Sequence, residues 1–520
     1  MTRILVTEKL ADNGLQAMAA AGYEVDVQLD LTPESLLQAI AGAAALVVRS
    51  ATKVTADVLE AGRDLQVVGR AGVGLDNVDV EAATRVGVMV VNAPESNILS
   101  AAEHAFGLML AQARNIPQAH SALVAGRWER SKWEGVELHG KTLGVVGLGR
   151  IGALVAQRAL AFGMRLIAYD PYISEERAKR MGVELMTLDG LVAAADFITI
   201  HLPKTKETTG LFNAEMLAKC KPGVRLVNAA RGGLIEEQAL ADAIVSGHVG
   251  GAAIDVFDAE PTTESPLFAI PSVVVTPHLG ASTEEAQDKA GEQIAEQIVL
   301  ALRGDFVPYA VNIAARGASE AVRPFLGVAE KLGRFLAALC GSLPETLEVE
   351  YQGELAGEDT SILTLSVLKG FFAAASEEPV SYVNAPRLAE ERGLAVRESQ
   401  TTTSDRVNLI VVSAAAHSVA GTLSGEGAAR IVSVDAHEVE VPSAEHMLIV
   451  RNDDRPGMIG VVGTAVGAAG ISISNMAVGQ SPTGGTALMV LALDRPLDDA
   501  ARAALSGAPG ILDLHLVSGV

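Results

Sequence analysis

The amino-acid sequence predicts an α/β protein with two doubly wound parallel sheets, followed by an α+β domain and a small ferredoxin-like domain of βαββαβ type. Three observations support this prediction. The chain has 520 residues, which is too long for one hydrophobic core. Short apolar runs alternate with helical patterns up to residue 303, as in parallel sheets covered by helices. After residue 312 this rhythm ends, and strands of alternating polar and apolar residues follow.

The first sheet is predicted from apolar runs that are separated by helical segments. Strands are expected at 3–8, 23–27, 45–50, 65–72 and 88–94, with helices at 33–42 and 55–62 among them. Ligands on such sheets bind at the carboxyl ends of the strands. Arg49, Ser50 and Arg70 fall at such ends, so they are candidate ligand-binding residues.

A long helix at 96–114 leads into the second series of strands. These are expected at 141–149, 165–170, 196–203, 224–233, 251–261 and 273–280, and a helix at about 283–303 follows them. Because the second series lies between two long helices, we interpret it as an insertion into the first. The expected domains are residues 1–97 together with 281–312, and residues 98–280.

The rest of the chain is expected to form two further domains, at 313–445 and 446–520. An amphipathic helix is predicted at 324–339, and residues 346–440 mix alternating strands with polar turns. From residue 446 the order is strand, helix, two strands, helix and strand, which is the ferredoxin-like pattern. Residues 346–440 contain no catalytic constellation.

The composition is that of a globular protein with an acidic surface. Hydrophobic residues make up 49% and charged residues 20% of the chain, and the formal net charge is −23. Such a surface repels phosphate backbones, so we expect no nucleic-acid partner. No apolar run is long enough for a membrane span, and the first residues do not resemble a signal peptide. We therefore expect a soluble cytoplasmic protein without a membrane partner.

The cysteines and histidines show no pattern that is typical of metal sites. Cys220 and Cys340 lie far apart without a CxxC motif, which disfavours a disulfide framework and a thiolate zinc site. His104 lies within the long helix, where we expect it at a subunit contact and not in catalysis. The histidines other than His104 and His278 show no metal-ligand spacing. We expect no metal.

A glycine-rich stretch, Gly147-Leu148-Gly149-Arg150-Ile151-Gly152, follows an apolar strand and opens an apolar helix. Glycines there allow a tight turn and close approach of a pyrophosphate, which the helix N-terminus then faces. The next strand ends at Asp170, whose carboxylate can accept both ribose hydroxyls and repels a 2′-phosphate. This context predicts a Rossmann domain that binds NAD in preference to NADP.

Three polar residues, Arg231, Glu260 and His278, each follow an apolar strand of the second series. Parallel strands deliver them to the same edge of one sheet. Oxidation of an alcohol needs a base for the hydroxyl proton, and a histidine suits that task near neutral pH. A carboxylate beside it stabilises the imidazolium, and a guanidinium can hold a substrate carboxylate. We therefore predict a dehydrogenase of a hydroxy acid.

Several stretches of the chain resemble the D-isomer-specific 2-hydroxyacid dehydrogenases and, more narrowly, the long-form D-3-phosphoglycerate dehydrogenase family. The matching stretches are VVRSATKVTADVL (47–59), VVGRAGVGLDNVDVEAATRVGV (67–88), SNILSAAEHAFGLMLAQAR (96–114), GKTLGVVGLGRIG (140–152), LVNAARGGLIEEQAL (226–240), AAIDVFDAEP (252–261) and TPHLGAST (276–283). The resemblance implies a flavodoxin-like substrate domain with an inserted Rossmann domain, then an intervening domain and an ACT domain. It implies NAD-dependent oxidation of 3-phospho-D-glycerate to 3-phosphohydroxypyruvate, the first step of L-serine biosynthesis.

Two other functions share this scaffold, a glyoxylate or other 2-oxoacid reductase and an NAD-sensing binding protein of the corepressor type. Arg49, Arg70 and the C-terminal domains argue against the reductase, because a small acid without a phosphate does not need the two arginines. A basic or peptide-docking cleft would favour the binding protein, and the sequence shows neither.

The resemblance also implies a role for individual residues. His278 would be the proton donor and acceptor, Glu260 its partner, and Arg231 the carboxylate clamp. Residues implied to contact NAD are Val73, Gly147, Gly149, Arg150, Ile151, Gly152, Asp170, Leu202, Ala229, Ala230, Arg231, Asp255, His278, Leu279, Gly280 and Ala281. Residues implied to face the substrate are Arg49, Ser50, Arg70, Gly74 and Asn97, with Arg130 reaching the phosphate from a neighbouring subunit.

The ACT domain implies regulation and assembly. Such domains pair across subunits and bind amino acids at the shared edge, and in this family the effector is often L-serine. The resemblance places that site at Asn452, Asp454 and Ser472, near a helix start. Ser472 departs from the asparagine that serine-responsive relatives commonly carry there. The family and the ACT edge imply a homotetramer.

Overall fold

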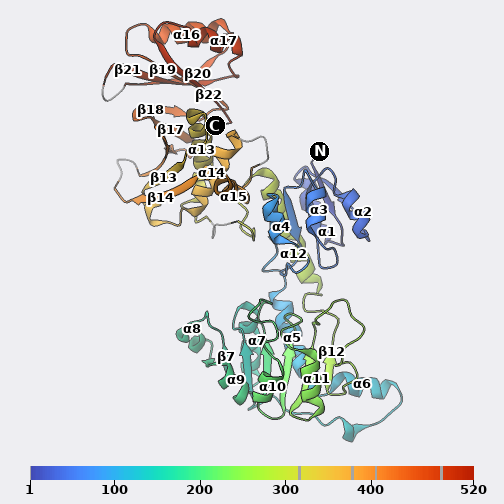
Figure 1. Ribbon diagram of the computed structural model, residues 1–520. Coiled ribbons are helices and arrows are strands. Elements are labelled where there is room, and N and C mark those ends of the chain that lie inside the picture. The colour runs from blue at the N-terminus through green and yellow to red at the C-terminus, as the bar shows by residue number, and fades with distance from the viewer. Residues whose placement is uncertain (1, 314–317, 376–379, 404–406, 481–483, 520) are drawn as a thin grey trace.

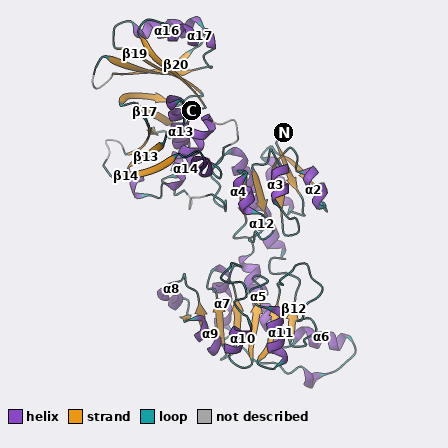
Figure 2. Cartoon of the chain, viewed as in Figure 1, coloured by secondary structure: helices purple, strands orange, loops and turns teal. Residues whose placement is uncertain are grey.

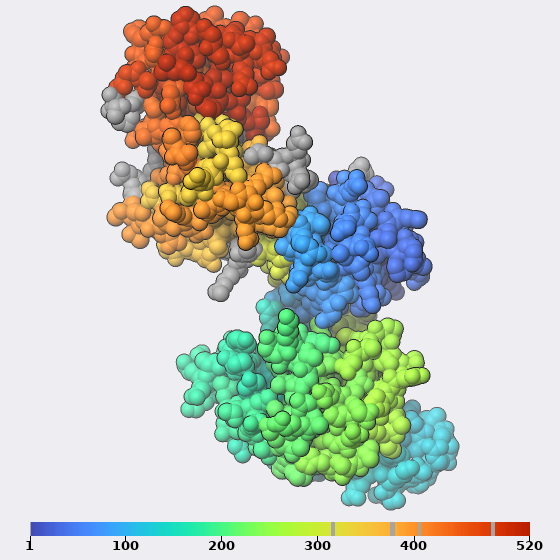
Figure 3. Space-filling model, in the orientation of Figure 1, coloured from blue at the N-terminus to red at the C-terminus, as the bar shows by residue number. Residues whose placement is uncertain are grey.

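The computed structural model describes residues 2–313, 318–375, 380–403, 407–480 and 484–519, and it arranges them around four sheets (Figures 1 and 2). Each sheet with its helices forms a domain, which we name by the order of the sheets along the chain. Figure 3 shows the first-sheet domain (blue) between the second-sheet domain (green) and the C-terminal part (yellow to red).

The first-sheet domain has five parallel strands in the order β2-β1-β3-β4-β5. Its strands are β1 (Arg3–Val6), β2 (Glu24–Val27), β3 (Ala43–Val48), β4 (Val67–Arg70) and β5 (Met89–Asn92). Helices α1 (Asp12–Ala20) and α12 (Glu284–Arg303) cover one face, and α2 (Pro33–Ala39), α3 (Ala56–Ala61) and α4 (Val80–Arg85) cover the other. This order is the flavodoxin-like one, as predicted.

The second-sheet domain has seven parallel strands in the order β12-β11-β10-β9-β6-β7-β8. The strands are β6 (Thr142–Val146), β7 (Arg165–Tyr169), β8 (Glu184–Leu185), β9 (Phe197–Ile200), β10 (Val224–Asn228), β11 (Val249–Ile254) and β12 (Val273–Val275). One face is covered by α5 (Ile98–Ala113), α7 (Arg150–Ala161) and α8 (Glu175–Arg180), and the other by α9 (Leu188–Ala194), α10 (Ala214–Lys219) and α11 (Glu237–Val245). The strand order reverses between β6 and β9, where dinucleotides bind on such sheets.

Two helices carry the chain between these domains. α5 follows β5 of the first sheet but packs on the second, and α12 follows β12 of the second sheet but packs on the first. The segments that enter and leave the second-sheet domain thus lie side by side, and Ser100 contacts Thr283 there. The domain limits predicted from the sequence stay predictions. Helix α6 (Ile116–Val124) and the short helix η1 (Arg130–Lys132) form an arm that projects from the second-sheet domain (Figures 1 and 3).

The third-sheet domain is of the α+β type. Its six strands, in the order β14-β13-β15-β16-β17-β18, are antiparallel except for the β13–β14 pair. The strands are β13 (Thr346–Gly353), β14 (Ala395–Thr401), β15 (Asn408–Ala414), β16 (His417–Leu423), β17 (Ala429–Val434) and β18 (His437–Pro442). The helices are η2 (Arg323–Phe325), α13 (Leu326–Cys340), η3 (Glu354–Gly357), α14 (Ser361–Ala375) and α15 (Ala385–Glu391). The helix predicted at 324–339 starts as the turn η2, which contains Pro324, and continues as α13.

The fourth-sheet domain has the predicted βαββαβ order. It comprises β19 (His446–Asp453), α16 (Met458–Ala468), β20 (Ile473–Gln480), β21 (Thr486–Leu493), α17 (Asp499–Ser506) and β22 (Ile511–Ser518). The antiparallel order β20-β21-β19-β22 is the ferredoxin-like one. Both helices cover one face, and the other face shares an apolar core with the third-sheet domain through Met447, Ile449 and Val490. Within the described ranges, no helix has the length and apolarity that a membrane crossing needs.

Candidate active site

A cavity of about 690 Å³ lies between the first-sheet and second-sheet domains. One wall consists of loops that follow β1, β3 and β4, and the other consists of loops that follow β11 and β12. The first wall contributes the cations Lys9, Arg49, Lys53 and Arg70, together with Ser50; Asn97 adds an amide, and the second wall contributes Glu260 and His278. The cavity thus brings an acid–base pair and a cluster of positive charge into one space.

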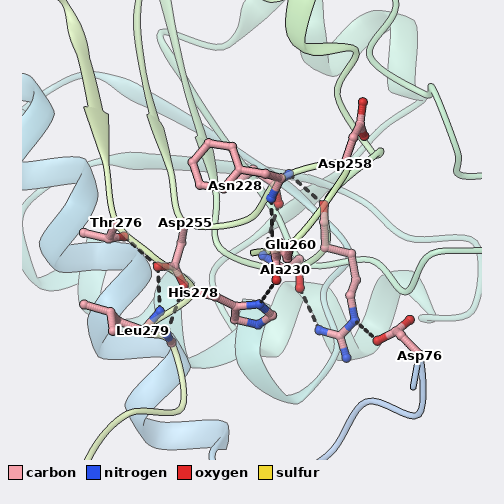
Figure 4. Close-up of polar contacts among 12 residues, drawn as sticks. Asp76, Asn228, Ala230, Asp255, Asp258, Glu260, Thr276, His278 and Leu279 are labelled. Carbon is pink, nitrogen blue, oxygen red and sulfur yellow. Dashed lines mark hydrogen bonds and ion pairs between the residues drawn. The ribbon is translucent and has the colours of Figure 1, made fainter. Parts of the chain in front are cut away.

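His278 and Glu260 form a short hydrogen-bonded pair in this cavity (Figure 4). His278 Nδ1 lies 2.5 Å from Glu260 Oε2, and Glu260 Oε1 accepts a hydrogen bond of 2.8 Å from the amide of Phe257. The hydrogen bond to Glu260 raises the pKa of His278 above its usual value against the effect of partial burial. Burial would raise the pKa of Glu260, but its hydrogen bonds to His278 and Phe257 together hold it below the usual value.

The turn that carries His278 is held by Asp255, whose side chain is completely buried. The Asp255 carboxylate accepts hydrogen bonds from the Thr276 hydroxyl at 2.6 Å and from the amides of Leu279 and Gly280 at 2.8 and 2.9 Å (Figure 4). His278 itself has a φ of +54°, which is unfavourable for a residue with a Cβ. Such a conformation persists where surrounding contacts hold it in place, and here the hydrogen bonds to Asp255 hold it.

Arg231 reaches from the end of β10 to the first-sheet domain. Its Nε lies 3.2 Å from Asp76 Oδ2, and its Nη1 donates to the carbonyl of Ala230 at 2.7 Å (Figure 4). A Cβ on Gly74 would lie 2.3 Å from Nη2 of Arg231, so the guanidinium occupies the place of a side chain at 74. Arg231 is therefore fixed along one edge, beside the cavity.

Arg70 and Asn97 line the cavity, and each has a buried polar atom without a partner among the described residues. In the part of the chain that the structure describes, Arg70 Nε and Asn97 Oδ1 are buried and make no hydrogen bond. Burial and, next, the charge of Arg231 lower the pKa of Arg70 to about 10, while Asp76 and Glu8 oppose this effect. The guanidinium therefore remains charged at neutral pH. A buried guanidinium N–H without an acceptor fits an anionic ligand.

The glycine-rich loop between β6 and α7 has the features of a pyrophosphate cradle. A Cβ on Gly152 would lie 2.1 Å from the carbonyl oxygen of Gly147, so only glycine permits this close packing. A Cβ on Gly149, which caps α7, would meet no heavy atom within 4 Å, so the space before the helix N-terminus is open. Asp170 accepts hydrogen bonds from the amides of Leu148 and Tyr172, which fixes its carboxylate beside the loop. These residues fit a dinucleotide.

Family models match three parts of the chain. A model described as the NAD binding domain of D-isomer specific 2-hydroxyacid dehydrogenase matches residues 106–280. Models for the D-3-phosphoglycerate dehydrogenase intervening domain and for the ACT domain match residues 321–435 and 446–510.

Curated relatives match over almost their whole length. A D-3-phosphoglycerate dehydrogenase from Mycobacterium tuberculosis (strain H37Rv) is 48% identical, over 99% of this chain and 98% of its own. One from Bacillus subtilis (strain 168) is 40% identical, over 99% of both chains. The chain belongs to the D-3-phosphoglycerate dehydrogenase family. It is therefore an NAD-dependent oxidoreductase, and the reductase and corepressor alternatives are not favoured.

Solved structures match the first two domains. A structure of the TT0316 protein from Thermus thermophilus is 35% identical with a TM-score of 0.56, over 60% of this chain and 100% of its own. A D-lactate dehydrogenase from Aquifex aeolicus, complexed with NAD and lactic acid, is 26% identical with a TM-score of 0.53, over 61% of this chain and 100% of its own. These matches confirm the predicted fold class and the NAD cofactor.

Most residues that the family resemblance singled out lie around the cavity or along the carboxyl edge of the second sheet. Leu202, Ala229 and Ala230 follow β9 and β10, and Ala281 follows the His278 turn and lines the cavity. Val73 lies in the loop after β4, where its carbonyl accepts a hydrogen bond from Asn92. Arg150 starts α7 and pairs with Glu95 of the first-sheet domain at 3.0 Å. Their ligand contacts stay predictions.

Two groups of predicted residues, the phosphate ligand from a neighbouring subunit and the effector site, do not line the cavity. Arg130 lies in η1 of the arm and does not line the cavity of its own chain. Asn452, Asp454 and Ser472 lie in the fourth-sheet domain, where Asn452 is buried and the other two are exposed. Lys9 and Lys53 of the cavity wall were not predicted from the sequence, although each follows a strand of the first sheet closely. Asp76, the partner of Arg231, was not predicted either.

Proposed function

We propose that the chain oxidises 3-phospho-D-glycerate to 3-phosphohydroxypyruvate with NAD, in the first step of L-serine biosynthesis. The observation that carries this proposal is the cavity, with the His278–Glu260 pair on one wall and Arg49 and Arg70 on the other. An acid–base pair suits proton transfer from a hydroxyl, and two guanidiniums suit a phosphate. The full-length relatives named D-3-phosphoglycerate dehydrogenase support the same substrate. The cytoplasmic location predicted from the sequence is part of this proposal.

His278 takes the hydroxyl proton in this mechanism. Its Nδ1 faces Glu260, which leaves Nε2 to accept the proton of the C2 hydroxyl. Glu260 stabilises the imidazolium that forms, since it is the main cause of the raised pKa of His278. NAD, when bound, accepts the C2 hydride. The substrate thus loses a proton and a hydride and leaves as the ketone.

Arg231 orients the substrate carboxylate. Asp76 and the Ala230 carbonyl hold its Nε and one Nη1 hydrogen, so the remaining N–H groups are free to bind a carboxylate from the cavity side. Gly74 leaves the space for this guanidinium, because any larger residue would place its Cβ against Nη2. A carboxylate held there would orient C2 towards His278.

The phosphate is bound by the first wall of the cavity. Arg70 offers its unpartnered Nε, and Arg49 lies at the end of the neighbouring strand β3. Ser50 and Asn97 supply a hydroxyl and an amide for the remaining oxygens. The excess of cations on this wall suits a substrate that carries both a phosphate and a carboxylate.

NAD is bound along the carboxyl edge of the second sheet. The N-terminus of α7 would hold the pyrophosphate, and Asp170 would hold the adenosine ribose. The set of NAD contacts proposed is Val73, Gly147, Gly149, Arg150, Ile151, Gly152, Asp170, Leu202, Ala229, Ala230, Arg231, Asp255, His278, Leu279, Gly280 and Ala281. Asp255 acts through the His278 turn, since its own carboxylate is completely buried.

We propose that the chain assembles with copies of itself into a homotetramer. The arm carries apolar side chains on its surface, including Val124 and Trp128, which are 74% and 82% exposed. Large exposed apolar residues on one projecting segment are typical of an interface. A second copy that receives the arm would bring Arg130 to the phosphate side of the neighbouring cavity.

The fourth-sheet domain binds an amino-acid effector in this proposal, with L-serine as the candidate. Asp454 is exposed before the start of α16 and can hold an ammonium group, and the helix N-terminus can hold a carboxylate. Asn452 has a buried Oδ1 without a partner in the described part of the chain. Ser472 offers one hydroxyl, so we expect weaker serine binding than an asparagine would give there.

Turnover of the purified protein tests the proposed function. NADH absorbance is followed with NAD and 3-phosphoglycerate, and the keto product is trapped because the oxidation is uphill. D-glycerate and D-lactate serve as controls, and L-serine is then added. We expect turnover only with the phosphorylated acid. Activity confined to an unphosphorylated acid would keep the proton-transfer chemistry and overturn the substrate.

A further inference from the structure

His104 lies inside the chain against the catalytic turn, a place that its sequence pattern did not indicate. Its Nε2 is 3.1 Å from Asp255 Oδ1 and 3.2 Å from Thr276 Oγ1, and its side chain is 22% exposed. A carboxylate can only accept a hydrogen bond, so Nε2 of His104 carries the hydrogen. His104 is thus the one side chain of α5 that touches the Asp255 carboxylate in the described residues.

His104 adds a polar contact to a carboxylate that is completely buried. A completely buried carboxylate is costly unless its oxygens are hydrogen-bonded or paired with a positive group. The turn supplies three donors, from Thr276, Leu279 and Gly280. From outside the turn, His104 places its Nε2 beside both Asp255 Oδ1 and the Thr276 hydroxyl that donates to Asp255, and it thereby ties the turn to a helix.

Helix α5 also reaches the substrate wall. Asn97 caps its start and lines the cavity, and one turn later Ser100 Oγ lies 2.7 Å from Thr283 Oγ1. His104 follows after one more turn. The helix therefore contacts both ends of the segment 276–283, which carries His278 and leads into α12. Any shift of α5 against this segment acts on the orientation of His278.

We propose that His104 is a positioning residue for the acid–base step: it anchors Asp255, and Asp255 holds the His278 turn in its reactive orientation. This inference rests on the catalytic role proposed above for His278. His104 does not touch the substrate, and its effect passes through Asp255.

The same contact controls the charge near His278. Glu260, Asp255 and Arg231 are the charged groups that act on His278, and Asp255 is the one that faces His104. The hydrogen bond to Glu260 raises the pKa of His278 most, and the negative charge of Asp255 raises it further. Without the His104 N–H, the Asp255 charge is less compensated. The pKa of His278 then rises, and oxidation requires a higher pH.

Two substitutions separate this role from simple packing. His104→Leu removes the N–H at similar size, and His104→Gln keeps an N–H donor. We expect His104→Leu to lower kcat about tenfold, as for the loss of one hydrogen bond to a charged group. The acid limb of the pH profile is the range in which kcat/KM for 3-phosphoglycerate falls because His278 becomes protonated. This limb should move up by about half a pH unit. His104→Gln should restore much of both.

Ser100→Ala is the matched control. It removes the neighbouring contact between α5 and Thr283 without touching Asp255. Its acid limb should coincide with that of the wild type. Equal losses in His104→Leu and His104→Gln without a shift of the acid limb would reduce His104 to a packing residue and overturn the proposal.

A second readout does not depend on turnover. Diethyl pyrocarbonate modifies neutral imidazole, and the His278 side chain is 46% exposed to the reagent. The pH dependence of its modification, followed by peptide mapping, reports the titration of His278 directly. We expect the midpoint to move up in His104→Leu, and an unchanged midpoint would contradict the inference. Failure of the wild type to oxidise 3-phosphoglycerate would overturn the proposed function alone, because this midpoint is measured without substrate.

Discussion

The pairing of Glu260 with His278 makes a sharp prediction for Glu260→Gln. Glutamine keeps the size and can still accept the Nδ1–H hydrogen bond, but it removes the negative charge 2.5 Å from the ring. In the wild type the pKa of His278 is raised, so the base is neutral only above this raised value. Removal of the charge lowers the pKa of His278. The acid limb of the oxidation should therefore move to lower pH.

The size of the effect follows from the geometry. Two unit charges about 4 Å apart interact by about 4 kcal/mol at an effective dielectric constant of about 20. The His278 and Glu260 side chains are 46% and 32% exposed, so solvent screening reduces this to about 1–2 kcal/mol. Since about 1.4 kcal/mol corresponds to one pH unit, the acid limb should move down by about one unit.

The assay is kcat/KM for 3-phosphoglycerate oxidation across pH, with NADH absorbance as the signal and product trapping throughout. On the plateau we expect a loss of about 10- to 100-fold, because the imidazolium that forms in the reaction is less stabilised. The reverse reaction needs the protonated ring, so its activity should fall at a lower pH than in the wild type. An acid limb that stays in place or moves up would refute the role of Glu260.

Three further substitutions test other parts of the site. Asp170→Ala should narrow the preference for NAD over NADP, measured as the ratio of kcat/KM values, because the ribose loses its acceptor and the 2′-phosphate its repulsion; an unchanged ratio would contradict the ribose role. Arg70→Gln should raise KM for 3-phosphoglycerate about 100-fold with NAD affinity intact, since a buried charge-assisted bond is lost, and a normal KM would remove Arg70 from the phosphate site. Gly152→Ala places a Cβ 2.1 Å from the Gly147 carbonyl oxygen. We therefore expect a loss of about 1–3 kcal/mol in the free energy of unfolding and weaker NAD binding. An unchanged Tm would show that the loop can shift to accommodate the methyl group.

The two parallel sheets could be predicted because their signals are local. The buried strand β3 is a continuous apolar run, and β9 is apolar except for Thr199. The crossing of α5 and α12 between the domains could be inferred from their length and position in the chain. The third-sheet domain was predicted only in outline. Its β13–β14 pair is parallel within an otherwise antiparallel sheet, and such a register depends on contacts between distant segments.

The candidate site could likewise be predicted only in part, because some of its residues lie in local motifs and others come from distant elements. Gly147, Asp170, Arg231, Glu260 and His278 follow strands in recognisable motifs, so the sequence alone indicates them as candidates. The partners that hold them come from other elements. Asp76 meets Arg231 only across two domains, and His104 meets Asp255 only because α5 lies against the β11–β12 edge. Periodicity assigns His104 to a helix face but does not indicate what that face contacts.

Two ion pairs across the cleft bear on how the site selects its ligands. Arg231 pairs with Asp76 at 3.2 Å, and Arg150 pairs with Glu95 at 3.0 Å, so each arginine reaches from the second-sheet domain to a carboxylate of the first. Solvent-exposed ion pairs of this kind stabilise the folded protein by only about 0–1 kcal/mol, because water screens their charges. We propose that these pairs orient the two arginines in the absence of ligand, and that a ligand anion binds to the guanidinium N–H groups that the carboxylates leave free. A neutral ligand would gain no charge-assisted hydrogen bond there, so both positions would select for anionic ligands.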